Sequence, residues 1–230
     1  VQAWCDLSLP AYTSDIIDVG IQNNGVEHVV PEKMTADEFD TAQFIMTDKE
    51  TNTWKDIYEK KDDLYELKDL SNKELNDIDE ELTIPLIMNY QMRAMEVDTF
   101  KETIAKQMGK DVSAFADMSV EDIGAMMHVE LKSFKQEKED DDGNKVKVDC
   151  VDVRPIFANM LASGAMDKDQ ILSMRDTMED TIDTMGSSLV KSMGIAYAVA
   201  ADKDAGVNVD KIQKSYLLSA GLKMVGMALL

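Results

Sequence analysis

The acidic stretch Glu137–Asp149 holds the residue types closest to a metal site. With Gly143 at the sixth position of an EF-hand loop, the third and fifth positions are aspartates, as calcium loops require. The first position would then be Lys138 and the twelfth Asp149, where such loops use a carboxylate and a bidentate Glu. We therefore interpret the stretch as a solvated hairpin tip and expect no calcium site.

Other chemistry-bearing residues are sparse. His28 and His128 are the only histidines, and neither has a second ligand at metal-site spacing. No G-x-S-x-G nucleophile elbow occurs, and Gly186–Ser192 contains Gly and Lys without the spacing of a phosphate-binding loop. We assign no catalytic, cofactor-binding or metal-ligating residue, and we expect the chain itself to be no enzyme and to hold no cofactor.

Methionine is abundant, with seventeen in the chain. Apolar residues recur at helical spacing over 171–193, which predicts one continuous helical stripe. The stripe consists of Ile171, Met174, Met178, Ile182, Met185, Leu189 and Met193. We interpret it as core, since Met fills irregular gaps; the alternative is an adaptable apolar surface facing a small-molecule pathway.

Four hydroxyl and acid pairs at capping-box spacing predict helix starts near residues 36, 48, 72 and 120. They are Thr35/Glu38, Thr47/Glu50, Ser71/Glu74 and Ser119/Asp122. Apolar positions from Trp54 to Leu67 fit a helical face, and Pro85 is expected to start or kink a helix. A final helix is expected to begin near Val209.

One β signal lies near 129–153. Val129 and Leu131 alternate with charged residues before the Asp142-Gly143 turn signal, and Val146, Val148 and Cys150 do so after it. This pattern predicts a hairpin with a charged loop. The fold class is therefore mainly α with a small β-hairpin (α+β).

The composition excludes some partners. The 230 residues carry 24 Lys and Arg against 45 Asp and Glu, a net charge of −21, and such a surface repels nucleic acid and anionic lipid. At 44% hydrophobic and 30% charged residues, the chain is neither disordered nor an integral membrane protein by itself. No spacing rule pairs Cys5 with Cys150, so we expect free thiols.

The two ends of the chain are apolar. Tyr216–Leu230 supplies fifteen residues with one Lys and no helix stop signal, while about 20 are needed to cross a bilayer. We expect that it is the first part of a membrane span in a longer protein and that Val1–Pro10 is the last part of another.

Three segments carry a resemblance to a known family. They are Cys5-Asp6-Leu7-x-Leu9-Pro10 with Ser14-Asp15-Ile16-Ile17-Asp18-x-Gly20-Ile21-Gln22-x-x-Gly25; Pro31-Glu32 through Phe44-Ile45-Met46-Thr47; and Ile212-Gln213-x-x-Tyr216-Leu217-Leu218-x-x-Gly221-x-x-Met224. In order and placement, they resemble three parts of bacterial ABC multidrug exporter half-transporters: the outer end of the first transmembrane helix, the start of the first extracytoplasmic loop and the entry into the second transmembrane helix.

The resemblance implies an organisation. Residues 1–24 would be the outer end of transmembrane helix 1, residues 25–208 an extracytoplasmic helical domain, and residues 209–230 the start of transmembrane helix 2. The two terminal helices would run antiparallel. The domain would lie on the extracytoplasmic side of the cell membrane.

The resemblance also implies a function and partners. The domain would be a lid, gate or interaction module at the outer mouth of the export pathway, in contact with the membrane, the second half-transporter and exported small molecules. ATP and Mg²⁺ would bind the parent's cytoplasmic domain. The alternatives are a free-standing secreted or surface-exposed helical binding protein and an enzyme with an unrecognised site.

Overall fold

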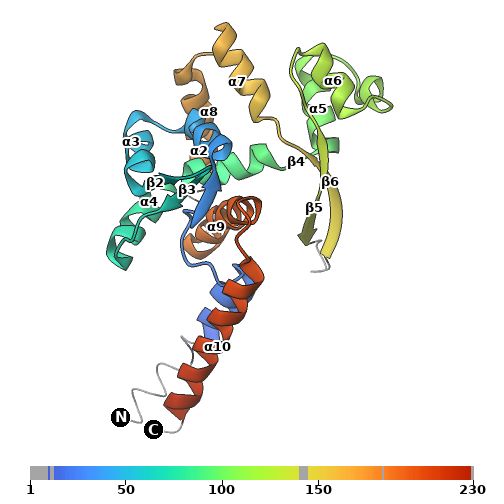
Figure 1. The fold of residues 1–230 in the computed structure, drawn as a ribbon. Helices are drawn as coiled ribbons and strands as arrows, with labels where there is room; N and C mark the ends of the chain where they lie inside the picture. Colours follow the sequence, from blue (N-terminus) through green and yellow to red (C-terminus); the bar gives the residue numbers. More distant parts are fainter. Residues whose placement is uncertain (1–9, 11–12, 140–144, 183, 229–230) are drawn as a thin grey trace. The chain divides into compact units, whose positions relative to one another are not determined.

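The computed structural model describes residues 10, 13–139, 145–182 and 184–228 (Figure 1). The chain forms two compact units, Val1–Ile87 with Arg175–Leu230, and Met88–Met174. Helices dominate, and each unit contains one three-stranded antiparallel sheet. This confirms the predicted mainly α class with a minor β component.

The first unit is built around a small sheet with the strand order β1-β3-β2. Its strands are β1 (Lys33–Thr35), β2 (Tyr58–Lys61) and β3 (Leu64–Leu67). The helices of this unit are η1 (Ile16–Gln22), α2 (Ala36–Ala42), η2 (Gln43–Ile45), α3 (Asp48–Ile57), the first part of α4 (Asn72–Arg93), the end of α8 (Lys168–Ile182), α9 (Ser187–Asp204) and α10 (Val209–Ala228).

Aromatic side chains fill the core of this unit. Trp54 and Tyr197 are completely buried, with ring centroids 6.4 Å apart. The rings of Phe39 and Tyr65 stack at 3.7 Å, and Tyr58 meets Trp54 edge-on at 4.9 Å. Such rings bury large apolar areas, so this cluster ties the sheet to α2, α3 and α9.

All four helix starts predicted from capping pairs are confirmed. In α3, the Glu50 amide donates to Thr47 Oγ1 at 3.3 Å, and the Thr47 amide donates to Glu50 Oε2 at 2.7 Å. α6 (Val120–Met126) begins with the same reciprocal pair, made by Ser119 and Asp122. Each pair satisfies amides that the first helical turn leaves without a partner, which is why the signal is local and readable.

Pro85 neither begins nor ends a helix. Helix α4 runs through it from Asn72 to Arg93. Leu82, Leu86 and Ile87 of this helix are buried, so packing on both sides of the proline offsets the backbone hydrogen bond that it lacks.

The expected helical face from Trp54 to Leu67 is wrong beyond Ile57. There α3 ends, and β2 and β3 form a hairpin whose two-residue loop starts at Asp62, with φ +54°. The apolar residues in this stretch do not alternate as in a half-buried strand, so the pattern favours a helix. Pairing of β3 with β1 produces strands instead, because it completes the sheet.

The second unit places a three-stranded sheet beside short helices. Its strand order is β4-β6-β5, with β4 (Met95–Glu96), β5 (Ser133–Glu139) and β6 (Lys145–Val151). Its helices are the end of α4, α5 (Val97–Gln107), η3 (Val112–Phe115), α6, α7 (Arg154–Ser163) and the start of α8. Phe100, Phe115, Ile123 and Val151 lie at the centre of its core, each at most 1% exposed.

The predicted hairpin is confirmed, with one correction. β5 and β6 pair over seven residues, from Ser133 opposite Val151 to Glu139 opposite Lys145. Val129 and Leu131, expected on the first strand, instead precede it. The Val129 amide donates to Gly124 O at 2.9 Å, and Leu131 is buried against α6, so both residues belong to the segment that packs on α6 before the strand begins.

The predicted continuous helix over 171–193 is wrong. The chain forms α8 and then α9, whose N-cap is Gly186. The assignment of the whole stripe to the core is also wrong. Ile171 and Ile182 are buried, whereas Met174, Met185 and Leu189 are 49%, 38% and 55% exposed. Met185 and Leu189 follow the end of α8 and so do not continue its buried face, whereas Met174 is exposed within α8 itself.

Candidate functional site

The helices nearest the two chain ends, η1 and α10, pack on each other in the first unit; we call them the terminal helix pair (Figure 1). Gln213 Nε2 donates to Gly20 O at 2.9 Å. A Cβ on Gly20 would lie 2.5 Å from Leu217, and one on Gly25 would lie 2.8 Å from the Gln213 backbone. Because Gly25 faces an earlier α10 residue than Gly20 does, the two helices run antiparallel, as predicted.

The glycines explain why the pair is close. Only a residue without a side chain lets the α10 backbone approach at Gly25, whose φ of +78° also disfavours other residues. The sequence Gly20 to Gly25 therefore shapes the contact with α10.

Both helices of the terminal helix pair expose apolar side chains. On α10, Leu218, Leu222 and Val225 are 67%, 64% and 59% exposed and lie one turn apart along one face. On η1, Ile17 and Ile21 are 45% and 57% exposed. Within the described chain, these five side chains therefore remain largely accessible to solvent.

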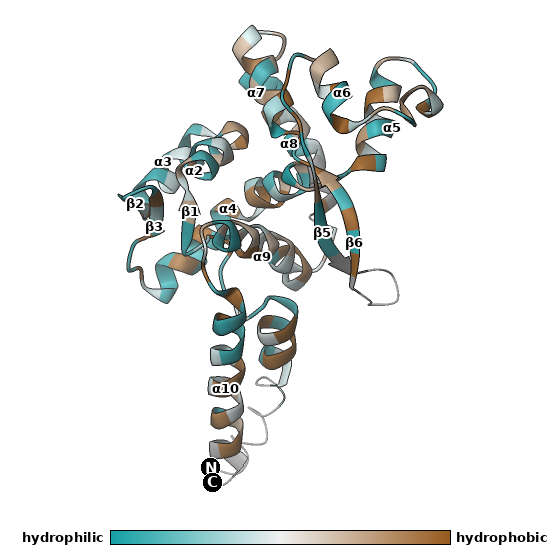
Figure 2. Cartoon of the chain, turned by 45° about the vertical axis from the view of Figure 1, so that its right-hand side comes forward, coloured by the Kyte–Doolittle hydropathy of each residue, from teal (hydrophilic) through white to brown (hydrophobic). Residues whose placement is uncertain are grey.

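The exposed face of α10 changes character along the helix. Lys211 and Lys214 are exposed at its start, and Leu218, Leu222 and Val225 follow at the same helical spacing. Figure 2 shows the same change, with hydrophilic residues near α9 and hydrophobic ones further along α10. The distance from Lys214 to Val225 is about 16 Å at the rise of an α-helix.

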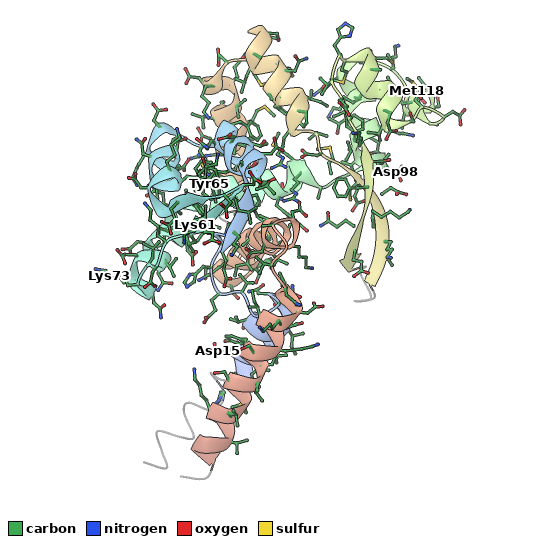
Figure 3. All side chains as sticks on the ribbon, viewed as in Figure 1. Asp15, Lys61, Tyr65, Lys73, Asp98 and Met118 are labelled. Atoms are coloured by element: carbon green, nitrogen blue, oxygen red, sulfur yellow. The ribbon has the colours of Figure 1, made fainter. Side chains whose placement is uncertain are left out.

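A cavity of about 710 Å³ lies beside the terminal helix pair. Its lining includes the carboxylates of Asp15 and Glu27, the ammonium groups of Lys211 and Lys223, and the ring of Tyr216. Figure 3 places Asp15 alongside α10. Partial burial raises the pKa of Tyr216, and the charges of Glu27 and Asp15 raise it further. The lining is of mixed charge, so the cavity favours no one class of ion.

A second cavity, of about 390 Å³, adjoins an ion-pair network centred on Asp79 in α4. Its carboxylate accepts hydrogen bonds from His28 Nδ1 at 2.9 Å and from the Val29 amide at 2.9 Å, and pairs with Lys191 Nζ at 2.8 Å. Burial alone would raise the pKa of Asp79, but these three partners outweigh burial and lower it. The network ties the segment after η1 to α4 and α9.

Asp202 in α9 is a buried carboxyl, 1% exposed. Burial raises its pKa to about 7, even though its Oδ1 accepts a hydrogen bond from the Lys33 amide at 2.8 Å. The charge of Glu32 contributes to the same rise. Asp202 therefore titrates near neutral pH, where most aspartates are fully ionised.

Local sequence patterns missed both acids. Asp79 and its partner His28 are 51 positions apart in the sequence, and Asp202 and its partner Lys33 are 169 positions apart. His28 thus belongs to an ion-pair network, while His128 occupies a turn after α6 with φ +57°.

Over the described residues, no three His, Cys, Asp or Glu side chains form a group that could hold a metal ion. The centre of the calcium-loop pattern, residues 140–144, lies outside the described part of the chain. Cys150 is buried in β6, and Cys5 also lies outside it.

Comparison with protein-family models, curated proteins and solved structures gives no match. Among the helices of the described ranges, none combines the length and the hydropathy that crossing a membrane requires.

Proposed function

We propose that this chain is the extracytoplasmic domain of an ABC-type exporter of small molecules, joined to the membrane through the terminal helix pair. One observation carries the proposal. The exposed face of α10 changes from lysine to leucine and valine along the helix, on a helix antiparallel to η1.

A loop domain between two consecutive membrane helices leaves the bilayer through the first and returns through the second, so its two ends must run antiparallel. The far end of the pair then meets hydrocarbon, and Leu218, Leu222 and Val225 lie there without cover from the described chain. Lys223, which is exposed among them, can extend its ammonium toward the headgroups. The resemblance of the terminal segments to exporter helices supports the same placement.

In this proposal the domain acts as a lid, gate or interaction module at the outer mouth of the pathway. Its partners are the bilayer, the second half-transporter and the exported compounds. Hydrolysis of ATP with Mg²⁺ takes place in the parent's cytoplasmic domain, and this chain contributes position and contact only.

The proposal is tested by measuring where α10 meets lipid. An environment-sensitive dye is attached to one introduced cysteine at position 214, 222 or 225 of a Cys5→Ser chain, in which the remaining Cys150 is buried. The labelled chain is then mixed with zwitterionic lipid vesicles. We expect a blue shift at 222 and 225 and little change at 214, because only the far end of α10 enters the hydrocarbon. Position 211 is the matched control at the polar end.

Equal shifts at all positions, or none, would contradict the proposal and favour a free-standing helical binding protein. A second measurement is the reading frame that encodes the chain. We expect an apolar span before residue 1, and further spans with a phosphate-binding loop after residue 230.

A further inference from the structure

Strand β5 is the outer strand of the second unit's sheet, so one of its edges is not paired with β4 or β6. From Ser133 to Glu137 its side chains are exposed, except for the half-buried Gln136. The Ser133 amide turns away from β6 and donates to Glu121 Oε1 at 3.2 Å. An exposed edge of this length is a template for pairing with another strand.

The charges on β5 alternate across the hairpin as well as along it. Lys135 lies opposite Asp149 of β6, and its Nζ contacts both carboxylate oxygens at 2.9 and 3.2 Å. Glu137 lies opposite Lys147 on the same face of the sheet. At the open edge of β5, the Lys135–Asp149 pair therefore presents a positive charge, and the neighbouring Glu137–Lys147 pair presents a negative one.

This arrangement is self-complementary about Gln136. Suppose that the β5 strand of a second copy pairs antiparallel with the first, so that the two Gln136 residues lie opposite each other. Lys135 of each copy then lies opposite Glu137 of the other. Each row then reads Asp149, Lys135, Glu137 and Lys147, with signs alternating across four strands. Opposite charges directly across a strand pair stabilise it.

The neighbouring registers lack this match. Shifting the second strand by two residues in one direction sets Lys135 opposite Lys135 of the other copy. A shift of two residues in the other direction sets Glu137 opposite Glu137 of the other copy. Like charges directly opposite each other destabilise a strand pair, so of these three registers the one centred on Gln136 is favoured.

We propose that β5 is a docking edge for a second copy of this chain, paired antiparallel about Gln136. The two hairpins then form one continuous six-stranded sheet, counting β4 of each copy, with the twofold symmetry usual for a dimer. The inference rests on the hairpin alone and does not need the membrane placement of α10. Tethering two copies in one assembly would raise their effective concentration and strengthen this short contact.

Disulfide trapping tests the register. In the Cys5→Ser chain of 230 residues, cysteine replaces Lys135, Gln136, Glu137 or Lys147 in turn, and covalent dimer is measured after mild oxidation. Directly opposite residues have Cα atoms about 4.5–5.5 Å apart, within disulfide reach. The two Lys147 positions would be separated by three strand spacings, about 14 Å. We expect at least roughly tenfold more dimer from Gln136→Cys than from Lys147→Cys.

Charge exchange separates docking from hairpin stability. Lys135→Glu should reduce self-association, and Lys135→Glu with Glu137→Lys should restore it, because the exchanged charges face each other again. Within the hairpin, the same double variant sets like charges against both Asp149 and Lys147, so its melting temperature should be the lowest. Association and stability therefore move in opposite directions.

Trapping is repeated in detergent, which disrupts pairing through the exposed face of α10 and leaves hydrogen-bonded strands in contact. Dimer centred on position 136 under both conditions supports the proposal. Equal trapping at all four positions, a maximum at 135, 137 or 147, or a monomer with no trapping overturns it. None of these results depends on whether the dye at position 222 senses lipid.

Discussion

Helices α9 and α10 follow each other in the chain and have similar lengths, 18 and 20 residues. They differ in whether their large apolar side chains are buried or exposed. α9 buries Ile195, Tyr197 and Ala198 in the first unit's core. α10 buries Val209 and Ala220 among its described side chains and exposes Leu218 and Leu222. Neither composition nor length distinguishes the two helices.

What distinguishes them is the partner that the fold supplies. α9 meets β1, Trp54 and α4, whereas α10 packs mainly on one short helix, η1, and makes fewer contacts with α9. An amphipathic helix derives its stability mainly from the surface that it buries. In the proposed function, lipid or a neighbouring membrane helix supplies what is missing around α10.

The largest effect should come from removing an α9 anchor. Tyr197→Ala empties a completely buried site beside Trp54 and should lower the free energy of unfolding by about 3–5 kcal/mol. Urea denaturation followed by fluorescence measures it. Leu189→Ala, on the same helix but 55% exposed, is the control and should change stability by less than about 0.5 kcal/mol. If Tyr197→Ala and Leu189→Ala lowered the stability equally, burial would not distinguish the two faces of α9.

A second large effect concerns Asp202, also on α9. Because burial raises its folded pKa to about 7, its protonated form stabilises the fold below about pH 4, and that stability is lost as pH rises through 7. Asp202→Asn retains the acceptor for the Lys33 amide and removes the titration. The variant should match the parent near pH 4 and exceed it by a few kcal/mol at pH 8.

Urea midpoints measured from pH 4 to pH 8 test this expectation. The quantity of interest is the difference between variant and parent, since other carboxyls contribute equally to both. Glu80→Gln, at an exposed position of α4, serves as the control for replacing a carboxyl by an amide. A constant difference between Asp202→Asn and the parent would mean that Asp202 keeps an ordinary pKa.

A smaller effect is expected where α9 approaches the segment after η1. A Cβ on Gly194 would lie 2.8 Å from Val29 Cγ1, closer than such atoms pack. Gly194→Val should therefore cost about 1–3 kcal/mol through overpacking. Gly221→Val on α10, where a Cβ meets nothing within 4 Å, should be much milder and is the matched test. Thermal unfolding of both variants compares the two helices directly.

The sequence predicts those parts of the fold that depend on near neighbours. Capping pairs such as Thr47 with Glu50 act within one helical turn, and the pairing of β5 with β6 joins segments that are close in the sequence. The hairpin Tyr58–Leu67 was missed because its apolar residues do not alternate, and a distant strand, β1, completes the sheet that stabilises it.

The candidate site is harder to predict for the same reason. The apolar character of α10 is plain in the sequence, and the antiparallel arrangement of the ends follows from the exporter hypothesis. The exposure of Leu218, however, depends on which helices the fold places beside it. The ionisation of Asp202 depends on Lys33 and Glu32, which only the folded chain brings near.

The smallest stability effect should come from the most exposed apolar residues. Leu218→Ser with Leu222→Ser changes two side chains that are 67% and 64% exposed, so the free energy of unfolding should move by no more than about 0.5 kcal/mol per site. Self-association or detergent binding through α10 should fall sharply, because an exposed apolar patch drives both. Analytical ultracentrifugation with and without detergent measures this change. Ser215 and Ser219 are also exposed on α10, where they line the larger cavity. Ser215→Thr with Ser219→Thr is therefore a control for altering exposed α10 positions without removing apolar area. If the double serine variant instead lost several kcal/mol of stability, this face of α10 would be packed within the folded chain, and the contrast with α9 would disappear.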